Sequence, residues 1–119
     1  MSSENVEDKL ARLLIRNGYN VQTGSDFPST IDVLATKEDR LYLFEVKTYG
    51  TIDFSDLARM KSLESMWSER LKSDKRKTRS FIITKGEVTD ETKELSRDLR
   101  IDICRFGQLT TVIEKLKKK

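Results

Sequence analysis

Two short apolar segments joined by four polar residues constrain the fold of this chain more than any other part of the sequence. They are residues 31–36 and 41–47, and both are rich in Leu, Val, Ile and Phe. Segments of this length and composition, separated by the turn 37–40, predict an antiparallel β-hairpin. Both faces of each predicted strand are apolar, so helices must cover the sheet on both sides. We therefore expect an α/β fold.

Three charged residues interrupt the apolar pattern of the hairpin, namely Asp32, Glu45 and Lys47. If the turn closes symmetrically, residues whose numbers sum to 77 face each other, which places Asp32 opposite Glu45. Alternation along a strand puts Lys47 on the face of Glu45 and Val46 on the other face. Opposed like charges are destabilising, and an unpaired buried carboxylate costs several kcal/mol. A divalent cation between the two acids would remove this penalty, so the hairpin is a candidate metal site.

The same alternation assigns the apolar residues of the hairpin to two faces. We expect one face to hold Ile31, Val33, Tyr42 and Phe44, and the other to hold Leu34, Leu41 and Leu43.

Composition excludes several classes of chemistry. The 119 residues include no histidine, which excludes histidine general bases, Ser-His and Cys-His nucleophiles, and histidine-ligated zinc. The single cysteine, Cys104, cannot form an internal disulfide and lies in an apolar segment, which indicates a buried thiol and a reducing, cytoplasmic location. No apolar run approaches about 20 residues, so we expect no membrane association.

The length and the remaining pattern predict a single domain over 1–119 with the element order αβββαβαβα. This order indicates a three-layer α/β/α sandwich around a mixed sheet of about five strands. Helices are expected at 4–17, 53–72, 90–99 and 109–116, and strands at 19–23, 31–36, 41–47, 80–84 and 101–106.

Glu7 has two interpretations. It lies in the first turn of the first predicted helix, where the helix dipole favours a carboxylate in any protein. It also shares a helix face with Ala11 and Leu14, at the edge of the apolar stripe, so it could point into the same site as Asp32 and Glu45. The sequence pattern alone does not decide between these interpretations.

The candidate ligands select the metal. Oxygen donors without imidazole or thiolate favour a hard cation, Mg²⁺ or Mn²⁺. Asp32 and Glu45 would bind it, and the Val46 carbonyl is available as a neutral third ligand. The bound cation would lower the pKa of a coordinated water and neutralise charge that develops on the substrate. Lys47, on the face of Glu45, is placed to orient the attacking water or to stabilise a pentacovalent phosphorus. The substrate indicated is a phosphodiester.

Asp32, followed thirteen residues later by Glu45-Val46-Lys47, resembles the motif of PD-(D/E)xK nucleases, which implies a restriction-endonuclease-like fold. Val6-Glu7 set eleven residues before Gly18 is similar to archaeal Holliday junction resolvases, and this resemblance implies that Glu7 belongs to the active site. A loop serine also matters in those enzymes, and Ser25 or Ser29 corresponds to it only loosely. The proline of the motif is displaced, since Pro28 is not adjacent to Asp32.

The C-terminal half departs from the resolvase pattern. Residues 81–86, followed by Val88-Thr89 and a helix, look more like Mrr-type restriction endonucleases, and no glutamine follows Lys47 in the next predicted helix as in the RecB exonuclease branch. The connector between the predicted helix at 53–72 and the predicted strand at 80–84 is basic. It reads equally as a solvated loop or as a phosphate-binding segment, whose members would be Lys72, Lys75, Arg76, Lys77 and Arg79.

The leading hypothesis is a Mg²⁺-dependent DNA endonuclease, which acts on branched, duplex or single-stranded DNA. The alternatives are a salt-bridge cluster in which Lys47 neutralises both acids, a catalytically inactive nucleic-acid-binding subunit, and a single-strand or RNA nuclease of a defence system. We also expect a homodimer, because such nucleases often address two strands with two sites. Its interface would use the surface around Met60, Met66 and Trp67, or the C-terminal helix.

Overall fold

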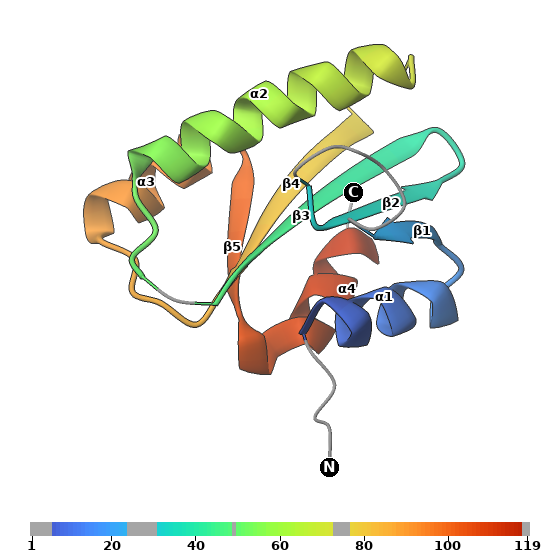
Figure 1. Ribbon diagram of the computed structural model, residues 1–119, viewed down its shortest axis with the longest axis horizontal. Coiled ribbons are helices and arrows are strands. Elements are labelled where there is room, and N and C mark those ends of the chain that lie inside the picture. The colour runs from blue at the N-terminus through green and yellow to red at the C-terminus, as the bar shows by residue number, and fades with distance from the viewer. Residues whose placement is uncertain (1–5, 24–30, 49, 73–76, 118–119) are drawn as a thin grey trace.

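A computed structural model describes residues 6–23, 31–48, 50–72 and 77–117. Five strands form one mixed sheet in the spatial order β1-β2-β3-β4-β5 (Figure 1). The strands are β1 (Asn20–Thr23), β2 (Val33–Lys37), β3 (Arg40–Lys47), β4 (Thr78–Thr84) and β5 (Ile101–Arg105). The helices are α1 (Val6–Arg16), α2 (Phe54–Arg70), α3 (Asp90–Asp98) and α4 (Leu109–Lys117), with a 3₁₀ turn at Phe106–Gln108.

The helices cover the sheet in two layers, as Figure 1 shows, with α1 and α4 on one face and α2 and α3 on the other. On the first face, buried side chains of β2, β3 and β4 pack with Leu10 and Leu14 of α1 and with Val112 of α4. On the second face, the sheet packs with Leu57 and Met60 of α2. The predicted α/β/α sandwich and its element order are therefore confirmed.

Local signals in the sequence define the helix ends. α2 begins with a capping box, because the Asp53 side chain accepts from the backbone N–H of Asp56 and the Asp56 side chain accepts from that of Asp53. Thr89 caps α3 through its hydroxyl. Two residues after the end of α1, Gly18 turns the chain with a φ of 89°, a conformation that glycine adopts without steric cost.

The pairing of β2 with β3 has the predicted register. Val33 faces Phe44 and Leu34 faces Leu43, so the paired residue numbers sum to 77. The ladder stops at Val33, whereas β3 continues for three residues, Glu45 to Lys47, that pair only with β4 on its other side. Asp32 lies at a bend just before β2. The end of β3 therefore projects past its antiparallel neighbour, and Asp32 stands beside the projecting part.

One assignment of residues to faces is wrong. Ile31 packs with Leu34, Leu41 and Leu43 on the α2 side, and not with Val33 and Phe44. Residues 31 and 32 precede the strand, so the two-residue alternation of an extended chain does not reach Ile31.

The surface predicted for a dimer is also largely core. Met60 and Trp67 are 1% and 4% exposed, because they pack against the sheet, and only Met66 of the three is exposed. The apolar residues of α4 are buried in the same way against the other face. Within the described residues, no helix is long and apolar enough to cross a membrane.

Two loops meet beyond the ends of the parallel strands β3 and β4. Ile52 forms an isolated parallel bridge with Val88, and its N–H donates to the Glu87 carbonyl at 3.0 Å. Gly86 lies so close to Gly50 that a Cβ atom at position 86 would be 1.8 Å from the Gly50 carbonyl oxygen. This contact fixes the chain that follows Glu45 and Lys47.

Candidate active site

Asp32 is tied to the end of β3 through the backbone. Its carboxylate Oδ2 accepts a hydrogen bond of 2.7 Å from the Val46 N–H. This N–H points away from β4, to the side where β2 has already ended, so a side chain takes the place of a missing strand partner. In an extended strand the carbonyl of a residue points to the same side as its N–H, and the Val46 carbonyl therefore faces the side of Asp32.

Glu45 points toward α2. Its carboxylate forms an ion pair with Arg59, and the Glu45 side chain is only 14% exposed. Arg59 also lowers the pKa of Asp32, so one guanidinium lies near both acids. The predicted cluster in which Lys47 neutralises both acids is therefore not formed. Arg59 supplies that counter-charge instead.

Lys47 is held by the start of α2. Its ammonium Nζ donates to the two carboxylate oxygens of Asp56 at 3.0 and 3.2 Å, and to the Thr51 carbonyl at 3.0 Å. Asp56 is the residue that closes the capping box of α2. The orientation of the lysine is therefore set by the first turn of a helix rather than by the acids of the hairpin.

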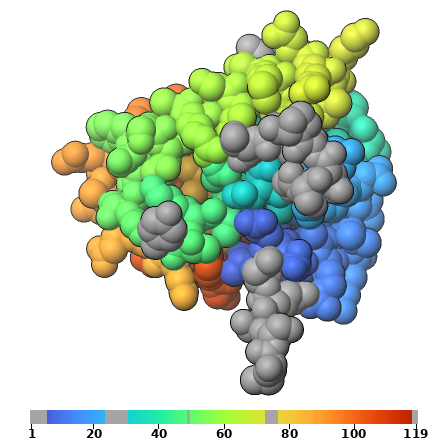
Figure 2. All heavy atoms as spheres, in the orientation of Figure 1, coloured from blue at the N-terminus to red at the C-terminus, as the bar shows by residue number. Residues whose placement is uncertain are grey.

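Glu7 joins the site from the other layer. Burial is the main cause that raises the pKa of Glu7, and repulsion from Asp32 and then from Asp8 raises it further. Burial also raises the pKa of Asp32, against the Val46 hydrogen bond and Arg59, which lower it. Figure 2 shows the first turn of α1 (dark blue) against the start of β2 (cyan), with α2 (green to yellow-green) above them. Of the two interpretations of Glu7, the structure favours the one that places it beside Asp32.

Asp32 and Glu45 thus both lie at the end of β3, and Glu7 lies close enough to Asp32 for the two charges to repel each other. Within the described residues, no three acidic or thiol side chains converge on one point. A cation would therefore be held by Asp32 and Glu45, and the Val46 carbonyl, water and substrate oxygens would complete its coordination. Such a set fits Mg²⁺, which usually keeps several waters and takes only one or two carboxylates. Burial is the main cause of both raised pKa values, and for Glu7 the charge of Asp32 adds to it, so a bound cation would stabilise the ionised form of these carboxylates.

A family model for restriction endonucleases (Mrr_cat) matches residues 1–113, nearly the whole chain. The chain belongs to this restriction endonuclease family.

Solved structures with the same fold agree with this assignment. A repair endonuclease from Pyrococcus abyssi superposes with a TM-score of 0.60 at 17% identity over 88% of this chain. Can2 from Sulfobacillus thermosulfidooxidans, solved with cyclic tetra-adenylate, gives 0.63 at 19% over 92%. EndoMS in a complex with double-stranded DNA gives 0.57 at 16% over 88%. The predicted restriction-endonuclease-like fold is confirmed.

The chain spans 48%, 34% and 46% of the lengths of these three chains, respectively, so it corresponds to about half of each or less. No curated protein matches the sequence.

Three of the residues predicted to bind nucleic acid are described, and they lie away from the acids of this restriction endonuclease domain. Arg79 on β4 pairs with Tyr42 on β3. Tyr42 precedes Glu45 by three residues, so Arg79 lies about 10 Å from the level of Glu45 along the strand direction. Lys77 is exposed and forms an ion pair with Asp39 of the hairpin turn. Lys72 is exposed at the end of α2. Ser25, Ser29, Lys75 and Arg76 lie outside the described residues.

Sequence reasoning missed two members of the site, Arg59 and Asp56. Both lie on α2, fourteen residues after Glu45 and nine after Lys47, so no local pattern links them to the hairpin. A signal for Asp56 was present, because Asp53 and Asp56 have the spacing of a capping box. No comparable signal marks Arg59, which looks like any solvent-facing arginine of a helix.

Proposed function

We propose that this chain is a metal-dependent endonuclease that hydrolyses DNA phosphodiester bonds at the end of β3. The observation that carries the proposal is the hydrogen bond of 2.7 Å from the Val46 N–H to Asp32, which ties one acid to the strand end that carries Glu45 and Lys47. Membership of a restriction endonuclease family supports cleavage of DNA. Two proteins of the same fold support DNA as the ligand, since EndoMS was solved with double-stranded DNA and MspJI with an oligonucleotide.

Asp32, Glu45 and the Val46 carbonyl would hold Mg²⁺ or Mn²⁺, with Glu7 beside them. When bound, the cation supplies a water of lowered pKa and neutralises negative charge on the substrate. Side chains of the protein would stabilise the transition state and orient the groups that do so. Lys47 carries an ammonium whose hydrogens stabilise the charge that develops on the phosphate oxygens. Asp56 orients that ammonium, and Arg59 offers a guanidinium to the phosphate once Glu45 is engaged elsewhere.

The position of the site supports the same conclusion. In open α/β sheets, ligands bind beyond the carboxyl ends of the parallel strands. Here β3 runs parallel to β4, and the acids lie at the carboxyl end of β3.

Cleavage assays with a substrate panel test the proposal. Duplex, single-stranded and four-way-junction DNA and an RNA of the same sequence are incubated with the chain and Mg²⁺. We expect wild type and the exposed α2 variant Glu69→Gln to cut DNA, and Asp32→Asn and Glu45→Gln to lose more than about a hundredfold in rate. Variants that cut as well as wild type, or no cutting with either Mg²⁺ or Mn²⁺, would contradict it.

The panel also separates the alternatives. Preference for the junction indicates a structure-specific enzyme, and preference for single strands or RNA indicates the defence-type nuclease. Binding without cleavage by wild type indicates an inactive nucleic-acid-binding subunit.

We further propose that the active form is a homodimer, so that two sites address two strands. With Met60 and Trp67 buried, the apolar residues left for an interface include the exposed Met66 and Leu71 at the end of α2. A monomeric mass by light scattering at micromolar concentration would contradict the dimer.

A further inference from the structure

A hollow lies at the opposite end of the strands from the acids. It has a volume of about 980 Å³ and is lined by the first residues of β3, β4 and β5 together with α2, α4 and the end of α3. We call it the basic groove. Arg40 lines the groove at the start of β3. Glu45 follows it by five residues, which corresponds to a distance of about 17 Å along the strand. The basic groove is therefore separate from the candidate active site.

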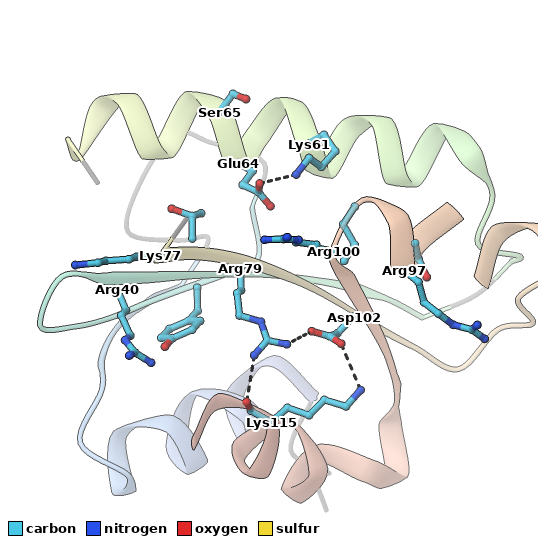
Figure 3. Close-up of a pocket in the computed structure, with 14 residues that line it drawn as sticks. Arg40, Lys61, Glu64, Ser65, Lys77, Arg79, Arg97, Arg100, Asp102 and Lys115 are labelled. Atoms are coloured by element: carbon cyan, nitrogen blue, oxygen red, sulfur yellow. Dashed lines mark hydrogen bonds and ion pairs between the residues drawn. The ribbon is translucent and has the colours of Figure 1, made fainter. Parts of the chain in front are cut away.

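The groove forms because β4 begins two residues before its pairing with β5 begins. β4 begins at Thr78, whereas the pairing with β5 begins at Ser80 and Ile101. Thr78 and Arg79 thus extend beyond the start of β5 and leave a notch in the sheet. Figure 3 shows Lys61 and Glu64 of α2 on one side of the sheet, and Lys115 of α4 on the other.

The lining is strongly positive. Among the described residues that line it, seven are Lys or Arg and two are acids. Both acids are already neutralised from within the groove. Glu64 accepts from Lys61 at 2.7 Å, and Asp102 pairs with Arg79 and, at 3.5 Å, with Lys115. Within the part of the groove that the structure describes, the surplus positive charge therefore has no further acid to pair with.

Two arginines at the end of α3 contribute to this surplus. Among the described residues, no carboxylate is paired with Arg97 or Arg100. Arg100 has a φ of 59° at the position just after the helix cap, where glycine is usual because a side chain there is strained. In Figure 3 its side chain extends between α2 and the sheet, near Glu64. An arginine thus occupies a strained position and places its charge in the groove, and such strain is characteristic of binding sites.

The cations form a row rather than a single cluster. Figure 3 shows Arg40 and Lys77 at one end, Arg79 and Arg100 in the middle and Arg97 at the other end. A small anion needs convergent donors, whereas a chain of phosphates needs donors spread along its path. The groove lies between α2 on one face of the sheet and α4 on the other, and its volume is about 980 Å³. Such a hollow between two helices accommodates a few nucleotides of one strand rather than a duplex.

We propose that the basic groove binds the phosphate backbone of a single-stranded nucleic acid at a distance from the candidate active site. The choice of nucleic acid over another polyanion rests on the proposed nuclease function. The groove would hold a strand that leaves or approaches the cleavage site, and it would add affinity without reading base sequence, since backbone contacts carry no sequence information.

Binding without cleavage tests the groove. Fluorescence anisotropy of a labelled oligothymidylate is measured with the full chain in EDTA at several salt concentrations. We expect Arg97→Ala and Arg100→Gly each to weaken binding about fivefold near 0.1 M salt and to reduce the salt slope by about 0.7. The exposed α1 variants Lys9→Ala and Arg16→Ala remove the same charge outside the groove and are expected to bind like wild type.

Arg100→Gly separates binding from folding. Glycine suits the backbone at position 100, so this variant is expected to melt at a higher temperature than wild type while it binds more weakly. A structural role for Arg100 would instead lower the melting temperature.

Several results would overturn the proposal. They are wild-type affinity in both groove variants, no binding by wild type, or equal loss in the α1 controls. Binding of polyglutamate, tripolyphosphate or a duplex as tight as that of the oligothymidylate, with the same dependence on Arg97 and Arg100, would also overturn it. Because the readout needs neither metal nor cleavage, failure of the groove is distinguishable from failure of the nuclease, which is tested by Glu45→Gln in the cleavage assay.

Discussion

Arg59 on α2 forms an ion pair with Glu45 at the end of β3. The guanidinium also lowers the pKa of Asp32, so it is the positive group that balances both acids in the absence of a metal. A cation that enters the site must therefore compete with Arg59 for the Glu45 carboxylate.

Removal of this competitor is expected to strengthen metal binding. The Arg59 side chain is 43% exposed, and an ion pair so accessible to solvent is worth about 1 kcal/mol, which corresponds to about a fivefold change in affinity. We expect Arg59→Ala to bind Mn²⁺ about fivefold more tightly, as measured by isothermal titration calorimetry. Arg70→Ala, at the other end of α2, serves as the control. Unchanged or weaker binding in Arg59→Ala would contradict the competition.

Asp56 and Asp53 offer a matched pair of variants. Both close the capping box of α2, but only Asp56 accepts from Lys47. We expect Asp53→Ala and Asp56→Ala to lower the melting temperature by similar amounts, since each breaks the cap. Only Asp56→Ala is expected to lower the cleavage rate, by about tenfold, because the lysine loses its orientation. Equal effects of the two variants on rate would show that Asp56 acts through helix stability alone.

The raised pKa values of Glu7 and Asp32 predict how stability depends on pH. Between the ordinary carboxyl pKa and the raised one, the folded protein binds more protons than the unfolded chain. Stability of the metal-free protein therefore falls as the pH rises through this range. We expect Glu7→Gln to melt at a higher temperature than wild type at pH 7, with the difference vanishing below the ordinary carboxyl pKa. Thermal melts in EDTA across this pH range measure it.

Glu114→Gln, on the exposed side of α4, is the control for that measurement. A Glu7→Gln variant that melts below wild type at neutral pH would contradict the raised pKa of Glu7, whose main cause is burial.

Two glycines differ sharply in the space around them. A Cβ atom at Gly86 would be 1.8 Å from the Gly50 carbonyl oxygen, whereas one at Gly107 meets nothing within 4 Å. Gly86→Ala must therefore separate the two loops, at a cost of about 1–3 kcal/mol, which lowers the melting temperature by about 5–10 °C. Gly107→Ala is expected to leave it unchanged or slightly raised. Calorimetry measures both, and equal melting temperatures would show that the loops separate without cost.

The parts of the fold that depend on neighbouring residues could be predicted from the sequence. The register of β2 and β3 follows from a symmetric turn, and the order of helices and strands follows from local periodicity. The assignment of Ile31 failed because the strand begins two residues later than the apolar pattern suggests. Met60 and Trp67 were placed at a surface because an apolar stripe does not reveal whether the same chain or a second copy covers it.

In the candidate active site, too, features set by neighbouring residues could be predicted and features set by tertiary packing could not. Glu45 and Lys47 both point toward α2, as strand alternation predicts. The prediction that Asp32 pairs directly opposite Glu45 is wrong, because Asp32 precedes the strand and instead accepts a hydrogen bond from the Val46 N–H. The positions of Arg59 and Asp56, which pair with Glu45 and Lys47, depend on how α2 crosses the sheet, which is set by packing over the whole second face. The basic groove was equally invisible, because it results from unequal starts of β4 and β5.

The hydrogen bond between the Val46 N–H and Asp32 has a spectroscopic consequence. The chemical shift of an amide proton depends on the charge of its acceptor, and any ligand that draws charge from the Asp32 carboxylate weakens this one bond. The Val46 amide resonance in a ¹H–¹⁵N spectrum is thus a natural reporter of occupancy. It allows a metal titration to be followed at a single backbone position, with no label attached to the substrate.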